Sequence, residues 1–583
     1  MTSQIPGETT ATTAQRIGWA ALIVVTLFIC YFSHLGVIGF VGPDEPRYAW
    51  IARDMAESGD WVTPRLYGKP WFEKPPLLYW GGAIFFRLMP GQPEFAARLP
   101  SAISALLATL ALAWLAWRIY GEECARWLLL LLPTSVGMIG FSHAAATDMP
   151  FAGMLIIAMV CAAAVLGLTR RVSGFVLTNP DVNNEDKPIL PQTSWLALML
   201  FGFFLGLAVL AKGPAAIILS GGAVFFWAVF TKRWRDALRL LHPTAIVSFC
   251  VTALPWYILC ARRNPDFFRI FIIEHNFKRF LTPEFQHLQP VWFYAPILFI
   301  AFFPWAALLA IAILWGGRRL IRTPQVQSTT CFVLSWALFV VVFFSASKSK
   351  LPGYILPAVP AVALLLAHAI SDSRLMPRKL SAGILLASGV MVVTSALLMR
   401  SYPDTLFRHL PVEPLAVSLL LLPLGVATVL AGLAPIVRAS SWQSTGLLNI
   451  SAVIIALTVV ASAGIIRRYY LDAAVSARGV ATLLRSEMPL PISPNNLRVF
   501  GIRRSDHYAL NFYLHREIPS WEDQPVRDGY VLTAHKYCDS LRTEDSCNDS
   551  WGMRDFVSSG SSALLRITPK DSLHGLGGGR EPK

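Results

Sequence analysis

Charged side chains are scarce in this chain. Only 15% of its 583 residues are Asp, Glu, Lys or Arg, whereas soluble domains carry roughly 25%, which argues against an ordinary soluble protein. Acidic residues are the rarer kind, 35 against 50 Lys and Arg, and the formal net charge is +15. Such a balance could indicate a nucleic-acid partner. We expect none, because the basic residues lie in short loops between apolar runs, as the positive-inside rule requires of a membrane protein.

Cysteine is also sparse, and its spacing excludes the common metal-binding and redox motifs. The chain has eight cysteines, with no Cys-x-x-Cys pair and no zinc-finger spacing. Six of them lie in or beside apolar runs, where we expect them to be buried as small apolar residues. Cys538 and Cys547 lie in the polar C-terminal part and could form a disulfide in an oxidising compartment.

Long apolar runs, by contrast, are abundant. Hydrophobic residues make up 55% of the chain, and many runs reach the length of about 20 residues that a membrane-spanning helix needs. The sequence therefore predicts a polytopic α-helical membrane protein. We count thirteen candidate spans: 17–38, 94–117, 124–142, 149–168, 194–211, 214–230, 243–261, 290–315, 329–346, 352–370, 381–399, 414–437 and 447–466.

Two other parts of the chain differ from these spans. They are segment 77–89 and residues 467–583. The first run, at 17–38, lacks a small-residue cleavage site, so we interpret it as a retained span. Segment 77–89 is shorter and contains two glycines, and we expect it to be interfacial or re-entrant. Residues 1–466 thus form a membrane domain with a first outer loop at 39–93. Residues 467–583 are polar, with strand-like stretches at 497–502 and 529–532, and predict a small α/β domain with a disordered tail.

The loops predict how the protein is oriented. Those after the second, fourth, sixth, eighth, tenth and twelfth spans are all basic, and most lack a matching acid. By the positive-inside rule these loops are cytoplasmic, as is the N-terminus, and the C-terminal domain lies outside. The loops with unusual chemistry then all belong to the outer face. This convergence points to one extracytoplasmic site.

The first outer loop contains two acids ahead of a short amphipathic helix, with Pro46 in its first turn and Gly59 as a plausible stop. Asp44 could cap this helix, or it could orient or deprotonate an acceptor. Glu45 is interpreted as a solvated neighbour or a supporting group. A Glu73–Lys74 pair follows, flanked by aromatics and prolines. Adjacent Glu and Lys are usually solvated, but a lysine here would suit a phosphate.

Further candidates lie where later spans meet the outer face. Asp148 is either a helix cap or a pocket carboxylate. Lys212 either extends its amine to the membrane surface or meets an anion there. His275 is either a packed residue or, with Glu73, an oxygen-plus-nitrogen pair suited to a divalent metal such as zinc. The donor-rich turn at 345–354 either anchors the chain at the interface or clamps a phosphate.

Taken together, these motifs resemble those of a known family. The stretches DEPRYAWIARDM, GDWVTPRLYGKPWFEKPPLLYW, EHNFKRF and SKSKLPGYILPAVPA, with Thr147-Asp148 between them, are similar to the lipid A aminoarabinose transferases. That family belongs to the protein O-mannosyltransferase superfamily of GT-C glycosyltransferases. The resemblance covers the membrane region in order and spacing, and the C-terminal domain contributes no motif to it.

The resemblance implies an enzyme of the bacterial inner membrane, with its active site and C-terminal domain in the periplasm. It would move a sugar, 4-amino-4-deoxy-L-arabinose or a similar pentose or hexose, from a polyprenyl monophosphate to lipid A or another envelope acceptor. No nucleotide sugar is implied, and a single displacement with inversion is expected. The resemblance implies a catalytic role for Asp44, a divalent metal at Glu73 and His275, phosphate contacts from Lys74 and Tyr354, and pocket positions for Arg47, Asp148 and Lys212. Together with the donor-rich turn, this predicts catalytic residues Asp44 and Asp148 and donor binding by Arg47, Lys74, Lys212, Lys348, Lys350 and Tyr354.

Three other functions fit parts of the pattern. A protein O-mannosyltransferase, or a transferase for another envelope glycan, would keep the fold and change the acceptor. A transporter or flippase would bind the same lipid phosphate without chemistry, and it predicts an inverted repeat with broken helices near the bilayer midplane. We find no internal repeat in the sequence. A structural membrane scaffold would leave the charged, proline-stiffened first loop unexplained.

Overall fold

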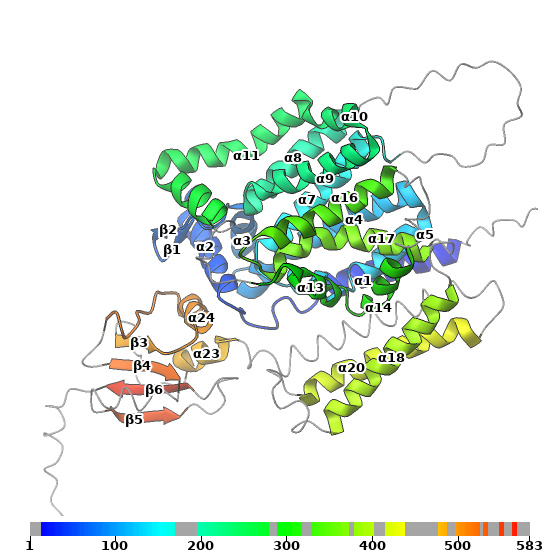
Figure 1. Ribbon diagram of the computed structural model, residues 1–583. Coiled ribbons are helices and arrows are strands. Elements are labelled where there is room, and N and C mark those ends of the chain that lie inside the picture. Colours follow the sequence, from blue (N-terminus) through cyan, green and yellow to red (C-terminus); the bar gives the residue numbers. More distant parts are fainter. Residues whose placement is uncertain are drawn as a thin grey trace, which may run out of the picture.

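The computed structural model describes residues 13–169, 195–278, 289–316, 328–371, 378–401, 414–437, 476–486, 496–524, 529–534, 547–552 and 562–567. It shows a helical membrane region and, beside it, a small domain built of a sheet and two helices (Figure 1).

The membrane region is almost entirely helical. Its α-helices are α1 (Thr13–Phe32), α2 (Asp44–Ser58), α3 (Leu77–Leu88), α4 (Pro93–Tyr120), α5 (Glu122–Leu131), α6 (Val136–Ser142), α7 (Asp148–Val165), α8 (Trp195–Lys212), α9 (Ala215–Thr231), α10 (Trp234–Leu238), α11 (Pro243–Arg263), α13 (Tyr294–Ala301), α14 (Ala306–Ile311), α16 (Ser328–Ala346), α17 (Val359–Ser371), α18 (Arg378–Ser401) and α20 (Pro414–Val437). Between them lie the 3-10 helices η1 (Arg239–Leu241), η3 (Val291–Phe293) and η5 (Pro352–Ala358) and the π-helices η2 (Arg269–Lys278) and η4 (Ala312–Gly316).

Several helices are long and apolar enough to cross a membrane. Among the described residues there are six, namely α4, α7, α8, α11, α16 and the continuous pair η5–α17, or seven if α5 and α6, bent by 62°, make one broken span. The chain is therefore a multi-pass helical membrane protein. The predicted number of thirteen spans stays a prediction, and the span expected at 447–466 lies outside the described residues.

Helix α7 occupies the middle of the bundle, between α4 and α8 (Figure 1). Apolar side chains project from every side of α7, and 83% of its membrane span is buried inside the protein. A helix that is hydrophobic on every side is expected in such a position, because each side can pack on another helix. Its first residue, Asp148, thus lies at one end of the bundle.

Helix α2 lies within the first outer loop. It buries an apolar stripe that includes Tyr48, Ile51 and Met55. It ends at Gly59, whose left-handed backbone (φ 74°) lets its N–H donate to the Met55 carbonyl at 3.1 Å. The stripe and the glycine are the features from which this helix was predicted.

A two-stranded hairpin returns the chain toward α2. Strands β1 (Arg65–Leu66) and β2 (Lys69–Pro70) pair antiparallel. Tyr67 and Gly68 connect them, and both have positive φ, 53° and 78°. Such angles are typical of the two-residue turns that match the twist of a hairpin. The turn brings the residues after Pro70 back alongside the first turn of α2.

The C-terminal domain contains a mixed four-stranded sheet in the order β3-β4-β6-β5 (Figure 1). Strands β3 (Leu497–Phe500) and β4 (Gly529–Ala534) are parallel, and β6 (Ser562–Ile567) runs antiparallel to β4 and to β5 (Cys547–Gly552). The two parallel strands coincide with the strand-like stretches found in the sequence. Helices α23 (Arg478–Ser486) and α24 (Arg504–Leu514) contribute to an apolar core shared with the sheet.

Helix α24 joins this domain to the membrane region. The Tyr513 hydroxyl donates to Glu94 Oε1 at 2.8 Å and accepts from the Phe40 backbone N–H at 2.9 Å. Beside it, the Phe512 ring contacts Phe40 edge-on at 4.7 Å between centroids and lies 4.1 Å from the Arg53 guanidinium carbon. The domain is therefore held against the first outer loop by polar and aromatic contacts.

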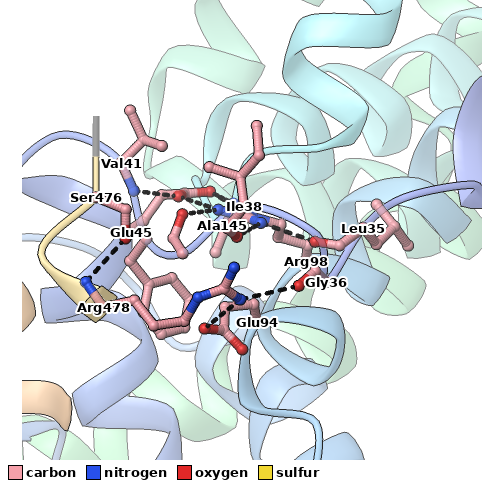
Figure 2. A network of polar contacts seen from close by, with 12 residues as sticks. Leu35, Gly36, Ile38, Val41, Glu45, Glu94, Arg98, Ala145, Ser476 and Arg478 are labelled. Atoms are coloured by element: carbon pink, nitrogen blue, oxygen red, sulfur yellow. Dashed lines mark hydrogen bonds and ion pairs between the residues drawn. The ribbon is translucent and has the colours of Figure 1, made fainter. Parts of the chain in front are cut away.

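A buried ion pair fixes the beginning of α2 (Figure 2). Arg98 of α4 donates two hydrogen bonds to the Glu45 carboxylate, at 3.0 and 2.7 Å, and both side chains are buried. Arg98 also donates to three carbonyl oxygens of the preceding loop, those of Leu35 at 2.7 Å, Ile38 at 2.6 Å and Gly39 at 2.8 Å. These five hydrogen bonds thus converge on one loop and one acid.

Glu45 uses its remaining acceptor capacity on backbone N–H groups. Its oxygens accept from Val41 and from Ala145, each at 2.7 Å. Of the two interpretations of Glu45, the solvated neighbour is therefore wrong and the supporting group is confirmed. A carboxylate can be buried here because a guanidinium and two backbone donors satisfy it. The carboxylate ties α2 to α4, to the loop before α2 and to the loop before α7.

We predict that Arg98→Met destabilises the protein by about 3–5 kcal/mol, because it leaves Glu45 charged and buried without its partner. The measurement is thermal unfolding in detergent. Arg126→Met is the matched control, since Arg126 pairs with the exposed Glu122 on α5 and its loss should cost about 1 kcal/mol or less. Equal unfolding temperatures for the two variants would contradict the structural role of the buried pair.

Candidate active site

The first group of candidate residues gathers around Arg47. Its Nη1 atom lies 3.1 Å from Glu73 Oε2, and its Nη2 atom pairs with the Asp44 carboxylate. Lys74 Nζ lies 3.5 Å from the other oxygen of Glu73. We call these four residues the α2 cluster. It brings two acids and two bases together from the start of α2 and from the segment after the hairpin.

Arg47 itself is buried, with 5% of its surface exposed. Its Nε–H donates to the Pro43 carbonyl at 2.9 Å, and its guanidinium carbon lies 5.6 Å from the centre of the Trp71 ring. Burial alone would lower the pKa of Arg47, but the charge of Glu73 and then that of Asp44 outweigh it, and the pKa is raised above its ordinary value. This cation therefore stays charged.

Asp44 is the exposed member of the cluster. About half of its side chain, 52%, is open to solvent, while that of Glu73 is 12% exposed. The helix begins at Asp44, yet no side chain caps it; its N-cap position is Pro43. The capping alternative from the sequence is therefore not what the carboxylate does. Asp44 is bound on one side by Arg47 and open on the other.

A second group lies where α7 begins and α8 ends. Lys212 Nζ donates to Asp148 Oδ1 at 2.5 Å. The same ammonium lies 4.6 Å from the centre of the Tyr354 ring, a cation–π distance. We call these three residues the α7 cluster. Asp148 is the first residue of α7 and does not cap it with its side chain.

Gly353 allows η5 to approach this cluster. A Cβ atom at this position would lie 2.5 Å from Asp148 Oδ1 and 3.0 Å from the Phe141 ring. Both distances are shorter than a van der Waals contact. A glycine is therefore needed for Tyr354, the next residue, to reach the ammonium of Lys212.

One cavity reaches both clusters. Its volume is about 460 Å³, and Asp44 lines one part of it and Asp148 another. Gly353, His34 and His143 are among the other residues that line it. The two carboxylates predicted to be catalytic therefore face the same space, although 103 positions separate them in the chain.

The turn before η5 contributes less than the sequence suggested. Lys350 is buried, and its Nζ donates to the Ser347 carbonyl of its own turn at 2.5 Å. Lys348 is exposed. The structure thus brings Tyr354 to the α7 cluster, whereas Lys350 closes the turn and Lys348 faces outward.

The predicted metal pair is described only in part. The side chain of Glu73 is described, and its oxygens lie close to the cations of Arg47 and Lys74. His275 lies in the π-helix η2, but its side chain is outside the described residues. Within the described part of the chain, no group of three His, Cys, Asp or Glu side chains could hold a metal ion. The described residues therefore do not make a metal centre, and the metal stays a prediction.

Sequence reasoning missed three residues that the site depends on. Glu94 and Arg98 lay within the apolar run at 94–117, and charged residues inside a predicted span are a signal in themselves. Tyr508 of α24 lies with its ring centre 5.3 Å from the Arg47 guanidinium carbon. No motif in the C-terminal domain pointed to Tyr508.

The chain is similar in sequence to known glycosyltransferases. Residues 18–271 match the family model of dolichyl-phosphate-mannose-protein mannosyltransferases. The chain is 32% identical over 354 residues to an undecaprenyl phosphate-alpha-4-amino-4-deoxy-L-arabinose arabinosyl transferase of Yersinia enterocolitica, covering 60% of this chain and 59% of that one. It is 33% identical over 365 residues to the enzyme of the same name from Serratia proteamaculans, covering 62% and 60%. The alignments thus span about 60% of the length of these relatives.

A solved structure extends the likeness to nearly the whole chain. The crystal structure of ArnT from Cupriavidus metallidurans bound to undecaprenyl phosphate matches with a TM-score of 0.73 and 22% identity, covering 94% of this chain and 98% of that one. At this identity the match shows the fold. The chain has the GT-C fold of ArnT, as the sequence predicted.

We predict that Gly353→Ala weakens binding of a polyprenyl phosphate, because the new Cβ would displace Asp148 from Lys212 and disturb the approach of Tyr354. Loss of one charge-assisted hydrogen bond corresponds to about 10- to 100-fold in affinity. The measurement is lipid titration in detergent. Gly140→Ala is the control at the same cavity, since a Cβ there meets nothing. Unchanged affinity in Gly353→Ala would remove the α7 cluster from lipid binding.

Proposed function

We propose that this ArnT-like GT-C protein is an integral-membrane glycosyltransferase that takes its sugar from a polyprenyl monophosphate. The sugar we expect is 4-amino-4-deoxy-L-arabinose or a similar pentose or hexose. The acceptor we expect is lipid A or another envelope glycolipid. The names of the sequence relatives and the lipid bound in the related crystal structure support this substrate class.

One observation carries the proposal: Asp44 and Asp148, the carboxylates of two carboxylate–cation clusters, line the same cavity. Each cluster offers a cation suited to a phosphate, Arg47 as a planar donor pair and Lys212 as a compact charge. Each also holds a carboxylate, Asp44 or Asp148, at the cavity wall. A phosphate and a nucleophile can therefore be held at one place, which is the requirement for a transfer reaction.

The carboxylates prepare the cations for a phosphate. Asp44 pairs with Arg47, and Asp148 with Lys212. These pairs hold the cations beside carboxylates that line the cavity and offset their charge while no donor is bound. A phosphate monoester or diester can then accept hydrogen bonds from the same N–H groups. The long side chains of the cations are thus ordered before the donor arrives. Less conformational entropy is then lost on binding, which favours tight binding.

In the proposed reaction, the bond between the anomeric carbon and the phosphate oxygen breaks. Its electron pair stays on the polyprenyl phosphate, whose developing charge the cations and the Tyr354 hydroxyl stabilise. An acceptor oxygen forms the new bond to the anomeric carbon from the opposite side. If the acceptor is a hydroxyl, Asp44 accepts its proton. If it is a phosphate, no proton needs to be removed and Asp44 organises the acceptor electrostatically.

The site is proposed to face the periplasm. The basic loops predict that the N-terminus is cytoplasmic, and the site residues occupy the loops of the opposite series. The C-terminal domain, which contacts Phe40 of the first outer loop through Tyr513, would lie on the periplasmic side as well. A polyprenyl-linked donor suits this location, because the compartment supplies no nucleotide sugar.

A protein hydroxyl is the second candidate acceptor. The match to the dolichyl-phosphate-mannose-protein mannosyltransferase family over residues 18–271 favours it. A transporter is disfavoured by where the charges lie. Asp148 and Lys212 are terminal residues of α7 and α8, whereas a transporter site is expected near the middle of its spans.

We predict that purified protein, given polyprenyl-phosphate aminoarabinose and lipid A, yields lipid A with the mass of one added sugar. Asp44→Asn should reduce the rate by about 10²- to 10⁴-fold, the range for loss of a general base, while leaving the protein folded. Mass spectrometry of the lipid product measures both. Asp54→Asn is the control, since it makes the same change on the same helix away from the cavity lining.

Two results would contradict this assignment. Full activity of Asp44→Asn would remove Asp44 from the mechanism. Absence of transfer to lipid A, to protein and to other envelope glycans, with any polyprenyl-linked sugar, would favour a transporter.

A further inference from the structure

The C-terminal domain reaches the candidate active site through one side chain. The ring centre of Tyr508, on α24, lies 5.3 Å from the guanidinium carbon of Arg47. The Trp71 ring lies at 5.6 Å from the same carbon and comes from the first outer loop. Arg47 therefore contacts aromatic rings from two separate domains of the protein.

The position of Tyr508 is set by the docking of its helix. Phe512 lies one turn further along α24, so both side chains project from the same face of the helix. Phe512 packs on Phe40 and on the Arg53 guanidinium. Tyr513 is hydrogen-bonded to Glu94 of α4. The contacts that hold the domain on the membrane region are therefore the ones that place Tyr508 over Arg47.

The hydroxyl of Tyr508 points to a different partner. Arg504, one turn earlier on α24, places its Nε and Nη2 atoms 3.3 and 3.2 Å from this oxygen. The hydroxyl thus contacts Arg504, whereas the ring centre lies 5.3 Å from the guanidinium carbons of both Arg47 and Arg504. Tyr508→Phe removes the hydroxyl contact and keeps the ring contacts.

The ring adds a contact of a different kind. Three of the five N–H groups of Arg47 donate to Pro43, Asp44 and Glu73. Aromatic rings hold the planar face of the guanidinium through cation–π attraction and leave its N–H groups to such acceptors. The rings also exclude water, and an ion pair is stronger in such surroundings.

We propose that Tyr508 is a positioning residue for sugar transfer: it holds Arg47 in the orientation that bridges Asp44 and Glu73. The inference rests on the proposed function and adds the C-terminal domain to the active site. The domain supplies part of the wall around the donor-binding cation. Its docking on α2 is then a condition for donor binding.

The experiment compares Tyr508→Ala, Tyr508→Phe and Tyr508→Trp in the full-length protein. The readout is the affinity for a polyprenyl phosphate, measured by titration in detergent. We expect Tyr508→Ala to weaken binding about 5- to 30-fold, the range for loss of a cation–π contact that is shielded from water. Tyr508→Phe and Tyr508→Trp keep a ring and should bind within about twofold of the wild type. Arg504→Ala removes the contacts of Arg504 with the hydroxyl and the ring of Tyr508 but leaves the ring over Arg47. It is the matched control and should behave like Tyr508→Phe.

A double-mutant cycle separates positioning from general damage to the domain. If Tyr508 acts through Arg47, Tyr508→Ala should cause no further loss of affinity in an Arg47→Ala background. A purely structural role would cause the same loss in both backgrounds. Thermal unfolding of each variant accompanies the titrations.

Several results would overturn the inference: wild-type affinity in Tyr508→Ala, an additive loss in the Arg47→Ala background, or failure of Phe and Trp to restore binding. The proposed function is decided separately. If the wild type binds the lipid but transfers no sugar, that function fails while the affinities still decide the role of Tyr508. If the wild type does not bind the lipid, both fail.

Discussion

The buried ion pair between Glu45 and Arg98 is the interaction on which the rest of the site depends. It joins the beginning of α2 to a membrane-embedded helix and to the loops on either side. Asp44 precedes Glu45 in the chain, and Arg47 follows two residues later. Because the ion pair fixes the backbone at Glu45, it also fixes the positions of Asp44 and Arg47. A buried charge pair is costly unless every donor and acceptor is satisfied. Here the backbone supplies the remaining partners, and the helix start becomes a rigid platform for two polar side chains.

Charge balance gives the candidate site its chemical character. Each cation that could bind a phosphate is paired with a carboxylate that lines the cavity or lies beside it, as Lys212 is with Asp148. The cations are thus oriented before a ligand arrives. Their arrangement at the ends of helices, around a cavity shared by distant segments, is suited to a lipid headgroup that enters at the membrane surface. The aromatic rings around Arg47 extend this arrangement to the C-terminal domain.

Much of the membrane region could be predicted from the sequence, and the reasons are local. Apolar runs, the stripe of α2 and the stop at Gly59 each depend on neighbouring residues. The candidate residues Asp44 and Asp148 were found because their motifs are local too. Contacts between distant segments were not predictable in this way: the sequence gives no sign that Arg98 would bury Glu45, or that Tyr508 would lie over Arg47. Lys348, chosen for its place in a donor-rich turn, faces outward because only part of a tight turn can point inward.

The central claim is that one lipid phosphate is held between the α2 cluster and the α7 cluster. An experimental structure of the protein with a bound polyprenyl phosphate tests it most directly. The account predicts phosphate density within hydrogen-bonding distance of a cation from each cluster, Arg47 or Lys74 on one side and Lys212 on the other. A phosphate bound elsewhere, for example beside Arg233 at the far end of α9, would contradict it.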